Sequence, residues 1–199
     1  MRTIQRLDIR FFRLLLGACL GLLLALVRPL AAQPLEQHAF VVRGGEVVLH
    51  DGDYRLDADI DFNLSPAAVD ALESGVPLVF ELRMELVRPR RYWLDENIAF
   101  LTQRYRLRFH ALSQRYVLTN LNTDESQNYA SIPSALDALG TVRSLPVIDR
   151  RLLRSDQTYE LWLRAGLDVD DLPPPLRTGA YLSPQWRLLS EWHVWRFQT

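Results

Sequence analysis

The chain has 199 residues and contains no lysine, so 23 arginines face 24 acidic residues and the net charge is −1. Residues 1–32 hold five arginines and one acid, which leaves eighteen arginines and 23 acids, a net charge of −5, in residues 33–199. A domain with this acidic balance lacks the basic footprint of a nucleic-acid-binding protein. The single cysteine, Cys19, excludes a disulfide framework and a cluster of thiolate metal ligands.

Residues 1–32 have the layout of a secretory signal peptide, with a basic start, an apolar run and an exit of small residues. The apolar run, residues 14–27, would give ~21 Å of helix, which is short of the ~30 Å hydrocarbon core of a bilayer. We therefore expect cleavage after Ala32, a periplasmic location and a single β-rich domain of residues 33–199. The alternative is an uncleaved anchor that holds the domain at the inner membrane, facing the periplasm.

Two residue pairs that contain glycine separate the apolar runs at the start of the predicted domain. Gly44-Gly45 separates two short apolar runs, and Asp51-Gly52 follows the second run. Primed turns need positive φ, so both pairs predict hairpins and a meander of three strands. In the third strand, residues 54–64, apolar and polar side chains alternate, which predicts one core face and one solvent face.

A short helix and a second pair of strands are expected next. Ser65 is a typical helix cap and Pro66 a typical first-turn residue. Residues 78–87 then alternate as a strand, and a turn at residues 89–96 reverses the chain. The return strand runs from about residue 98 to residue 112.

The middle of the chain predicts shorter elements. Residues 116–120 form a strand and residues 122–128 a polar loop. Ser134 begins a variant of the capping box and therefore a second short helix. Residues 145–149 contain a proline and are expected at a sheet edge.

Two late strands complete the predicted domain. Residues 159–165 and residues 186–195 both alternate apolar and polar side chains. The prolines at 173–175 cannot continue a ladder, so we expect a rigid bridge between these strands. Trp162 and Trp192 are expected to be mostly buried.

These elements together predict an all-β fold that is mainly antiparallel. Strands this many and this regularly punctuated argue against alternating strand–helix units. We expect a β-sandwich of about eight or nine strands with two short helices, and a barrel is the alternative closure of the same strands.

The best candidate binding element is the turn Arg90, Arg91, Tyr92 and Trp93. It places two guanidinium groups and two amphipathic rings on a connection, where recognition residues commonly lie. The competing interpretation is structural: Trp93 packs over the end of the core, and the arginines cover apolar surface or meet the two acids that follow.

Charged and polar side chains elsewhere lack the spacing of a metal or catalytic site. The alternate aspartates of residues 57–61 lie ~6.6 Å apart on a strand face, too far to share one calcium ion. They predict a solvated face, and would pair with the arginine ladder of residues 104–108 if the two strands were neighbours. Ser190 and His193 cannot form a triad by adjacency alone. We expect no metal, no cofactor and no enzymatic activity, while a hydrolase assembled from distant residues stays open.

Several motifs form a set that extends over nearly the whole of residues 33–199. They are Arg90-Arg91-Tyr92-Trp93, residues 106–113 with Tyr116, and the later residues Asp168, Leu172, Pro173, Pro175, Leu176, Trp186, Ser190 and Trp192. This set resembles the exported proteobacterial family called domain of unknown function 4390. The resemblance implies a periplasmic domain whose gene often lies beside one for a membrane sensor histidine kinase, and it implies no catalytic residues.

The expected function is a non-enzymatic binding or accessory module for an envelope protein such as a sensor histidine kinase. The alternative is a carrier of a small apolar ligand or lipid, with a cavity lined by residues such as Leu82, Met84 and Leu107. We expect no nucleic-acid partner, and membrane contact only through the leader if it is uncleaved.

Overall fold

The structure, a computed structural model, describes residues 40–91 and 93–199, so the predicted signal peptide lies outside the described residues. In that part of the chain the strands are β1 Val41–His50, β2 Asp53–Asp61, β3 Leu78–Arg88, β4 Glu96–His110, β5 Arg115–Asn120, β6 Ser126–Tyr129, β7 Thr141–Asp149, β8 Thr158–Leu167 and β9 His193–Gln198. The helices are α2 Pro66–Glu73, α3 Ile132–Gly140 and α4 Pro174–Leu182, with 3₁₀ turns η1 Arg150–Leu152, η2 Val169–Asp171 and η3 Pro184–Trp186. No helix of the described residues has both the length and the apolar character of a membrane span.

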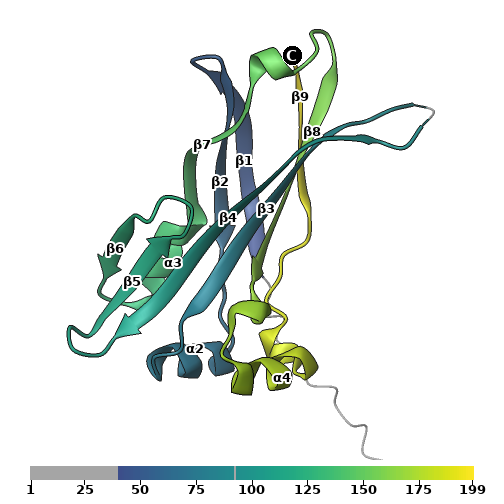
Figure 1. Ribbon diagram of the computed structural model, residues 1–199. Helices are drawn as coiled ribbons and strands as arrows, with labels where there is room; N and C mark the ends of the chain where they lie inside the picture. The colour runs from purple at the N-terminus through teal and green to yellow at the C-terminus, as the bar shows by residue number, and fades with distance from the viewer. Residues whose placement is uncertain (1–39, 92) are drawn as a thin grey trace, which may run out of the picture. The chain divides into compact units, whose positions relative to one another are not determined.

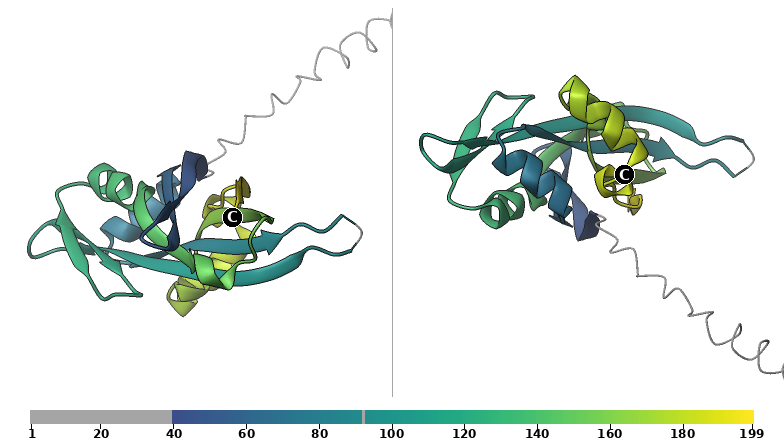
Figure 2. Two further views of the ribbon diagram at one scale, coloured as in Figure 1. Left: turned by 90° about the horizontal axis from the view of Figure 1, so that it is seen from above. Right: turned by 90° about the horizontal axis from the view of Figure 1, so that it is seen from below.

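The strands form two separate antiparallel sheets, which confirms the predicted β-sandwich (Figure 1). The small sheet has the order β1-β2-β7, and the large sheet has the order β6-β5-β4-β3-β8-β9. Seen along the sandwich, the small sheet covers one face of the large sheet, while α4 lies on the opposite side (Figure 2). The large sheet therefore has one face in the core and one outer face.

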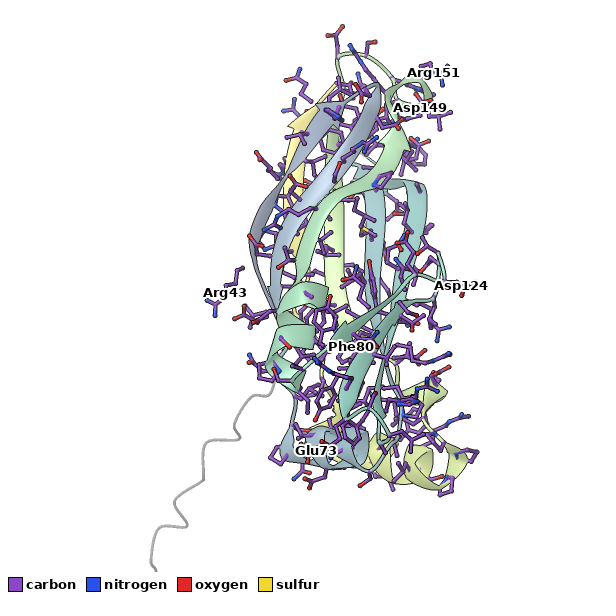
Figure 3. The ribbon with its side chains drawn as sticks, turned by 90° about the vertical axis from the view of Figure 1, so that its left-hand side faces the viewer. Arg43, Glu73, Phe80, Asp124, Asp149 and Arg151 are labelled. Carbon is purple, nitrogen blue, oxygen red and sulfur yellow. The ribbon has the colours of Figure 1, made fainter. Side chains whose placement is uncertain are left out.

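The core lies between the two sheets and follows the predicted alternation. Every second residue of β2, β3 and β8 is buried toward the facing sheet. Phe40, Phe62 and Phe80 form an aromatic cluster with ring centroids 4.8 to 5.9 Å apart. Figure 3 shows Phe80 between the sheets, with Asp149 and Glu73 at opposite ends of the sandwich.

The hairpin predicted at Gly44-Gly45 is wrong, because β1 runs through both glycines as one strand. The β1–β2 register shifts between Val42 and Gly44, so this is a bulge rather than a turn. A Cβ on Gly45 would lie 2.1 Å from the carbonyl oxygen of Asp57, which explains why glycine is needed there. The second predicted hairpin, at Asp51-Gly52, is confirmed by positive φ at both residues.

Four other element predictions need correction. The strand expected at residues 186–195 starts only at His193, as β9, and Trp186 belongs to η3. The segment expected to be a rigid proline bridge is helix α4. Pro174 is favourable at its first position, because its fixed φ is already helical and the N–H that proline lacks has no intrahelical acceptor there. Helix α3 begins earlier than expected: Ser131 is its cap, and Ser134 completes the capping box as its third residue. The loop expected at 122–128 contains strand β6, which pairs with β5.

The tryptophans expected in the core, Trp162 and Trp192, are only half-buried. Trp162 has the opposite parity to the buried Leu161 and Leu163, so its ring lies on the outer face of the large sheet. There it meets Trp192 edge to face, with ring centroids 6.2 Å apart. Trp186, in η3, is the buried member of the C-terminal group.

Candidate binding site at the tip of the β3–β4 hairpin

The longest pair of neighbouring strands ends in a projecting tip. Strands β3 and β4 have 11 and 15 residues, and their hairpin extends past the other strands of the large sheet (Figure 1). Pro89 follows directly after β3 and cannot donate to the ladder, so strand pairing ends there. The residues predicted to bind a partner are therefore held at the end of a long two-stranded support.

An ion-pair cluster closes the base of this tip. One oxygen of the Glu96 carboxylate accepts hydrogen bonds from both Arg88 and Arg90. The hydrogen bond from Arg90 lowers the pKa of Glu96 below its ordinary value, against the opposing effect of burial and with help from Arg88. The backbone N–H of Arg90 also donates to Asp95, at 3.1 Å. The carboxylate thus stays charged and fixes the turn.

A hollow of about 400 Å³ opens beside the tip. Its lining consists of Arg88, Pro89, Arg90, Arg91, Trp93, Arg154 and Gln157. The last two residues come from the segment between η1 and β8, so the hollow joins parts of the chain more than sixty residues apart. Sequence reasoning missed Arg154 and Gln157, because no local pattern relates them to the tip.

The segment that supplies Arg154 is anchored to neighbouring structure. The backbone N–H of Arg154 donates to the buried Tyr159 hydroxyl at 2.9 Å, and its carbonyl accepts from Thr199 Oγ1 at 2.6 Å. Nearby, the hydrogen bond from Arg151 lowers the pKa of Asp149 below its ordinary value. Arg151 is thus already paired with an acid, whereas Arg154 is held in place through its backbone.

The apolar side chains of the tip are exposed. Trp93 exposes 80% of its surface and the next residue, Leu94, exposes 91%. Trp93 therefore does not pack over the end of the core, as the structural interpretation expected. The other part of that interpretation is found, because Arg90 meets both acids that follow it. Tyr92 lies outside the described residues.

Helix α4, which follows the motif residues Asp168 and Leu172, lies at the end of the sandwich opposite the tip (Figure 1). Asp168 caps η2 and accepts a hydrogen bond from Arg104 of β4, at 2.6 Å. Burial lowers the pKa of Arg104, but the hydrogen bond and charge of Asp168, together with the charges of Asp171 and Glu81, outweigh burial and raise the pKa above its ordinary value. Ser190 accepts from the backbone N–H of Ala165 at 2.9 Å. Leu172 is buried, Pro173 is the N-cap of α4, and Pro175 and Leu176 lie in its first turn.

The acidic and basic ladders do not pair with each other. The aspartates of residues 57–61 lie on β2 of the small sheet, whereas the arginines of residues 104–108 lie on β4 of the large sheet. Asp59 pairs instead with Arg143, at 2.6 Å, and Asp61 pairs with Arg43. The two ladders are therefore separate solvated features rather than one site.

The other chemical candidates are not assembled within residues 40–91 and 93–199. No three or more metal-ligating side chains gather there at binding distance. The Ser190 hydroxyl donates to the carbonyl of Glu191, and the ring of His193 packs against Trp195 with centroids 4.4 Å apart. Leu82, Met84 and Leu107, named for an apolar cavity, are at most 1% exposed and belong to the filled core.

The fold and the tip define a two-sheet antiparallel sandwich with a projecting, arginine-rich hairpin. The family model described as domain of unknown function (DUF4390) matches residues 37–196, so the chain belongs to this family. The match confirms the family resemblance that the sequence motifs indicated. Comparisons with curated proteins and with solved structures each found no match.

Proposed function

We propose that the protein is a non-enzymatic periplasmic accessory module whose hairpin tip binds an envelope protein, namely the extracytoplasmic part of a membrane sensor histidine kinase. The observation that carries the proposal is the exposure of Trp93 beside a hollow whose lining includes four arginines. Tryptophan and arginine are the residues that most often dominate the free energy of protein–protein binding. A large exposed ring next to guanidinium groups is therefore a natural anchor for a partner.

The strands and ion pairs that hold the tip favour a binding surface that is already ordered before the partner binds. Strands β3 and β4 pair from Leu78 to Arg88 with one register shift, between Leu86 and Val87, and β8 flanks β3 on its other side. The ion pairs of Glu96 then fix the base of the turn. A preorganised site loses little conformational entropy on binding, so a small contact area can still bind usefully.

The basic and apolar leader, residues 1–32, supports placement of the domain in the periplasm. The kinase is chosen as partner because the family resemblance associates these proteins with a neighbouring sensor-kinase gene. A membrane kinase also presents an extracytoplasmic part to the same compartment. No residue group with catalytic spacing was found in the sequence, which supports a binding role over an enzymatic one.

Photo-crosslinking in cells tests this proposal. The full chain would carry a photoreactive phenylalanine analogue in place of Leu94, in a strain that makes the kinase encoded beside it. We expect a crosslink to that kinase, because Leu94 adjoins the exposed ring of Trp93. The matched control position is Leu112, which is 95% exposed on the β4–β5 turn at the far end of β4.

The companion variant is Trp93→Ala in the chain that carries the crosslinker at position 94. Loss of a central aromatic anchor weakens binding by about 2 kcal/mol or more, so the crosslinked fraction should fall by at least about tenfold. Equal crosslinking from positions 94 and 112, or none from either in cells that accumulate both proteins, would contradict the proposal.

A further inference from the structure

The hollow beside Trp93 has a one-sided charge. Its lining contains four guanidinium groups and no carboxylate. The Glu96 carboxylate balances only one of the two positive charges of Arg88 and Arg90, and Arg154 forms no ion pair with the described residues, so these three arginines carry an excess of positive charge. This excess of positive charge contrasts with the net charge of −5 in residues 33–199. The hollow is therefore a local cationic site on an acidic domain.

Arg154 is the member of this site best suited to meet a ligand. Its side chain forms no ion pair with any residue of 40–91 or 93–199, although its backbone is tied down on both sides. A guanidinium is a planar fork that matches a carboxylate with two parallel hydrogen bonds. The Arg154 backbone is held in place while its guanidinium has no acidic partner, so this side chain is well placed to bind an anion that enters the hollow.

The apolar half of the site limits what kind of anion fits. The Trp93 ring lines the hollow together with the arginines, and Leu94, the next residue in the chain, is also exposed. A free inorganic anion would leave both of them exposed to water. A peptide that carries acidic side chains next to an apolar one would cover the ring and neutralise the arginines together.

We propose that the hollow formed by Arg88, Arg90, Trp93 and Arg154 recognises an acidic peptide segment of the partner, with a carboxylate at Arg154 and an apolar side chain against Trp93. This inference rests on the proposed function, because it specifies the chemistry that the same tip takes. An anionic bilayer is a poorer ligand, since the acidic remainder of the domain is repelled by it.

The test measures fluorescence anisotropy of a labelled peptide with the purified full chain. The probe contains glutamates around one leucine, and its comparison peptide has glutamine in place of each glutamate. We expect the acidic probe to bind at least about tenfold more tightly, and its dissociation constant to rise about tenfold between about 0.05 M and about 0.5 M NaCl. Equal affinity of the two peptides would overturn the inference.

The decisive variant is Arg154→Gln, because the described structure gives this side chain no ion pair whose loss would disturb folding. It should weaken the acidic probe by about tenfold and leave the glutamine peptide unaffected. The matched control is Arg106→Gln/Arg108→Gln, which removes two exposed arginines near the far end of β4 and should leave affinity unchanged. The inference fails if both variants weaken the probe equally.

Two further outcomes separate this inference from the proposed function. If inorganic phosphate at the same ionic strength displaces the acidic probe better than chloride does, the hollow is a general anion site and the peptide inference is wrong. If the crosslink from position 94 to the kinase persists unchanged in Arg154→Gln, the tip binds the kinase without this chemistry and only the inference fails. If the probe binds but no kinase crosslink forms, the kinase is not the partner, while the inference that the hollow binds an acidic peptide stands.

Discussion

Trp186 and Trp192 belong to one short stretch of sequence but occupy different environments. Trp186 is 8% exposed within the main core cluster, whereas Trp192 is half-buried on the outer face beside Trp162 and Arg164. Truncation of a buried tryptophan leaves a cavity, while truncation of a surface ring mainly removes contacts that water can replace.

We therefore expect Trp186→Ala to lower the free energy of unfolding by ~3–5 kcal/mol and Trp192→Ala by about 1–2 kcal/mol. Urea denaturation of the two variants, followed by circular dichroism, measures the difference. Similar losses for both would mean that the outer face around Trp192 is covered in solution.

The burial of single residues could be predicted from sequence only where adjacent residues of a strand differed clearly in polarity. In β2 the residues alternate between apolar and charged, so the core face could be assigned from sequence. In β8 both parities carry bulky apolar side chains, since Leu161 and Leu163 flank Trp162. The choice between these faces depends on which one the small sheet covers.

At the scale of the element, the close approach of β1 to β2 next to the bulge depends on one glycine, Gly45. A Cβ at position 45 would meet Asp57 O at 2.1 Å and the Cα of Ala58 at 2.8 Å, and φ at Gly45 is +155°. Gly44, the preceding residue, has no atom within 4 Å of such a Cβ. The pair therefore offers a variant and a control that differ in position alone.

We expect Gly45→Ala to lower the free energy of unfolding by ~1–3 kcal/mol, because β1 must shift away from β2 to admit the methyl group. Gly44→Ala should be within about 0.5 kcal/mol of the wild type. Chemical denaturation of both variants tests this, and an unaffected Gly45→Ala would show that β1 is not held in this register.

Elements with strong local signals were predicted well, and the others were not. Ser65 accepts a hydrogen bond from the N–H of Ala68, which is the cap that the sequence indicated for α2. The prolines at 173–175 are compatible with two structures, because proline ends a β-ladder and is also favoured at the start of a helix. In this fold the segment forms a helix, α4, which is in contact with η2 and η3.

At the scale of the whole molecule, Arg104 connects the large sheet to the helical segment that contains α4. It pairs with Glu81 of the adjacent strand at 3.3 Å, and with Asp168 and Asp171 of the helical segment at 2.6 and 3.6 Å. The Arg104 side chain is more than a third exposed, so solvent screening keeps the contribution of these pairs modest.

We expect Asp168→Asn to speed amide hydrogen exchange in η2 and α4 while the ladders of both sheets keep their protection. Asparagine retains an oxygen that can cap η2, so the change isolates the ion pair with Arg104. Hydrogen-exchange mass spectrometry provides the measurement, and Asp171→Asn, at the longer of the two distances, should have a smaller effect. Uniform loss of protection throughout the domain would contradict this local role.

The sequence by itself determined the strand-rich composition, the cap of α2, the Asp51-Gly52 turn and the family, because these depend on residues close together in the chain or on motifs read in order. Only the tertiary structure decided how the strands divide between two sheets, and it placed Arg154 beside Trp93. Each of these outcomes joins distant segments, such as β2 with β7 and β3 with β8. Local patterns state which side chains prefer burial, but the partner that buries them is chosen by the packing of the whole chain.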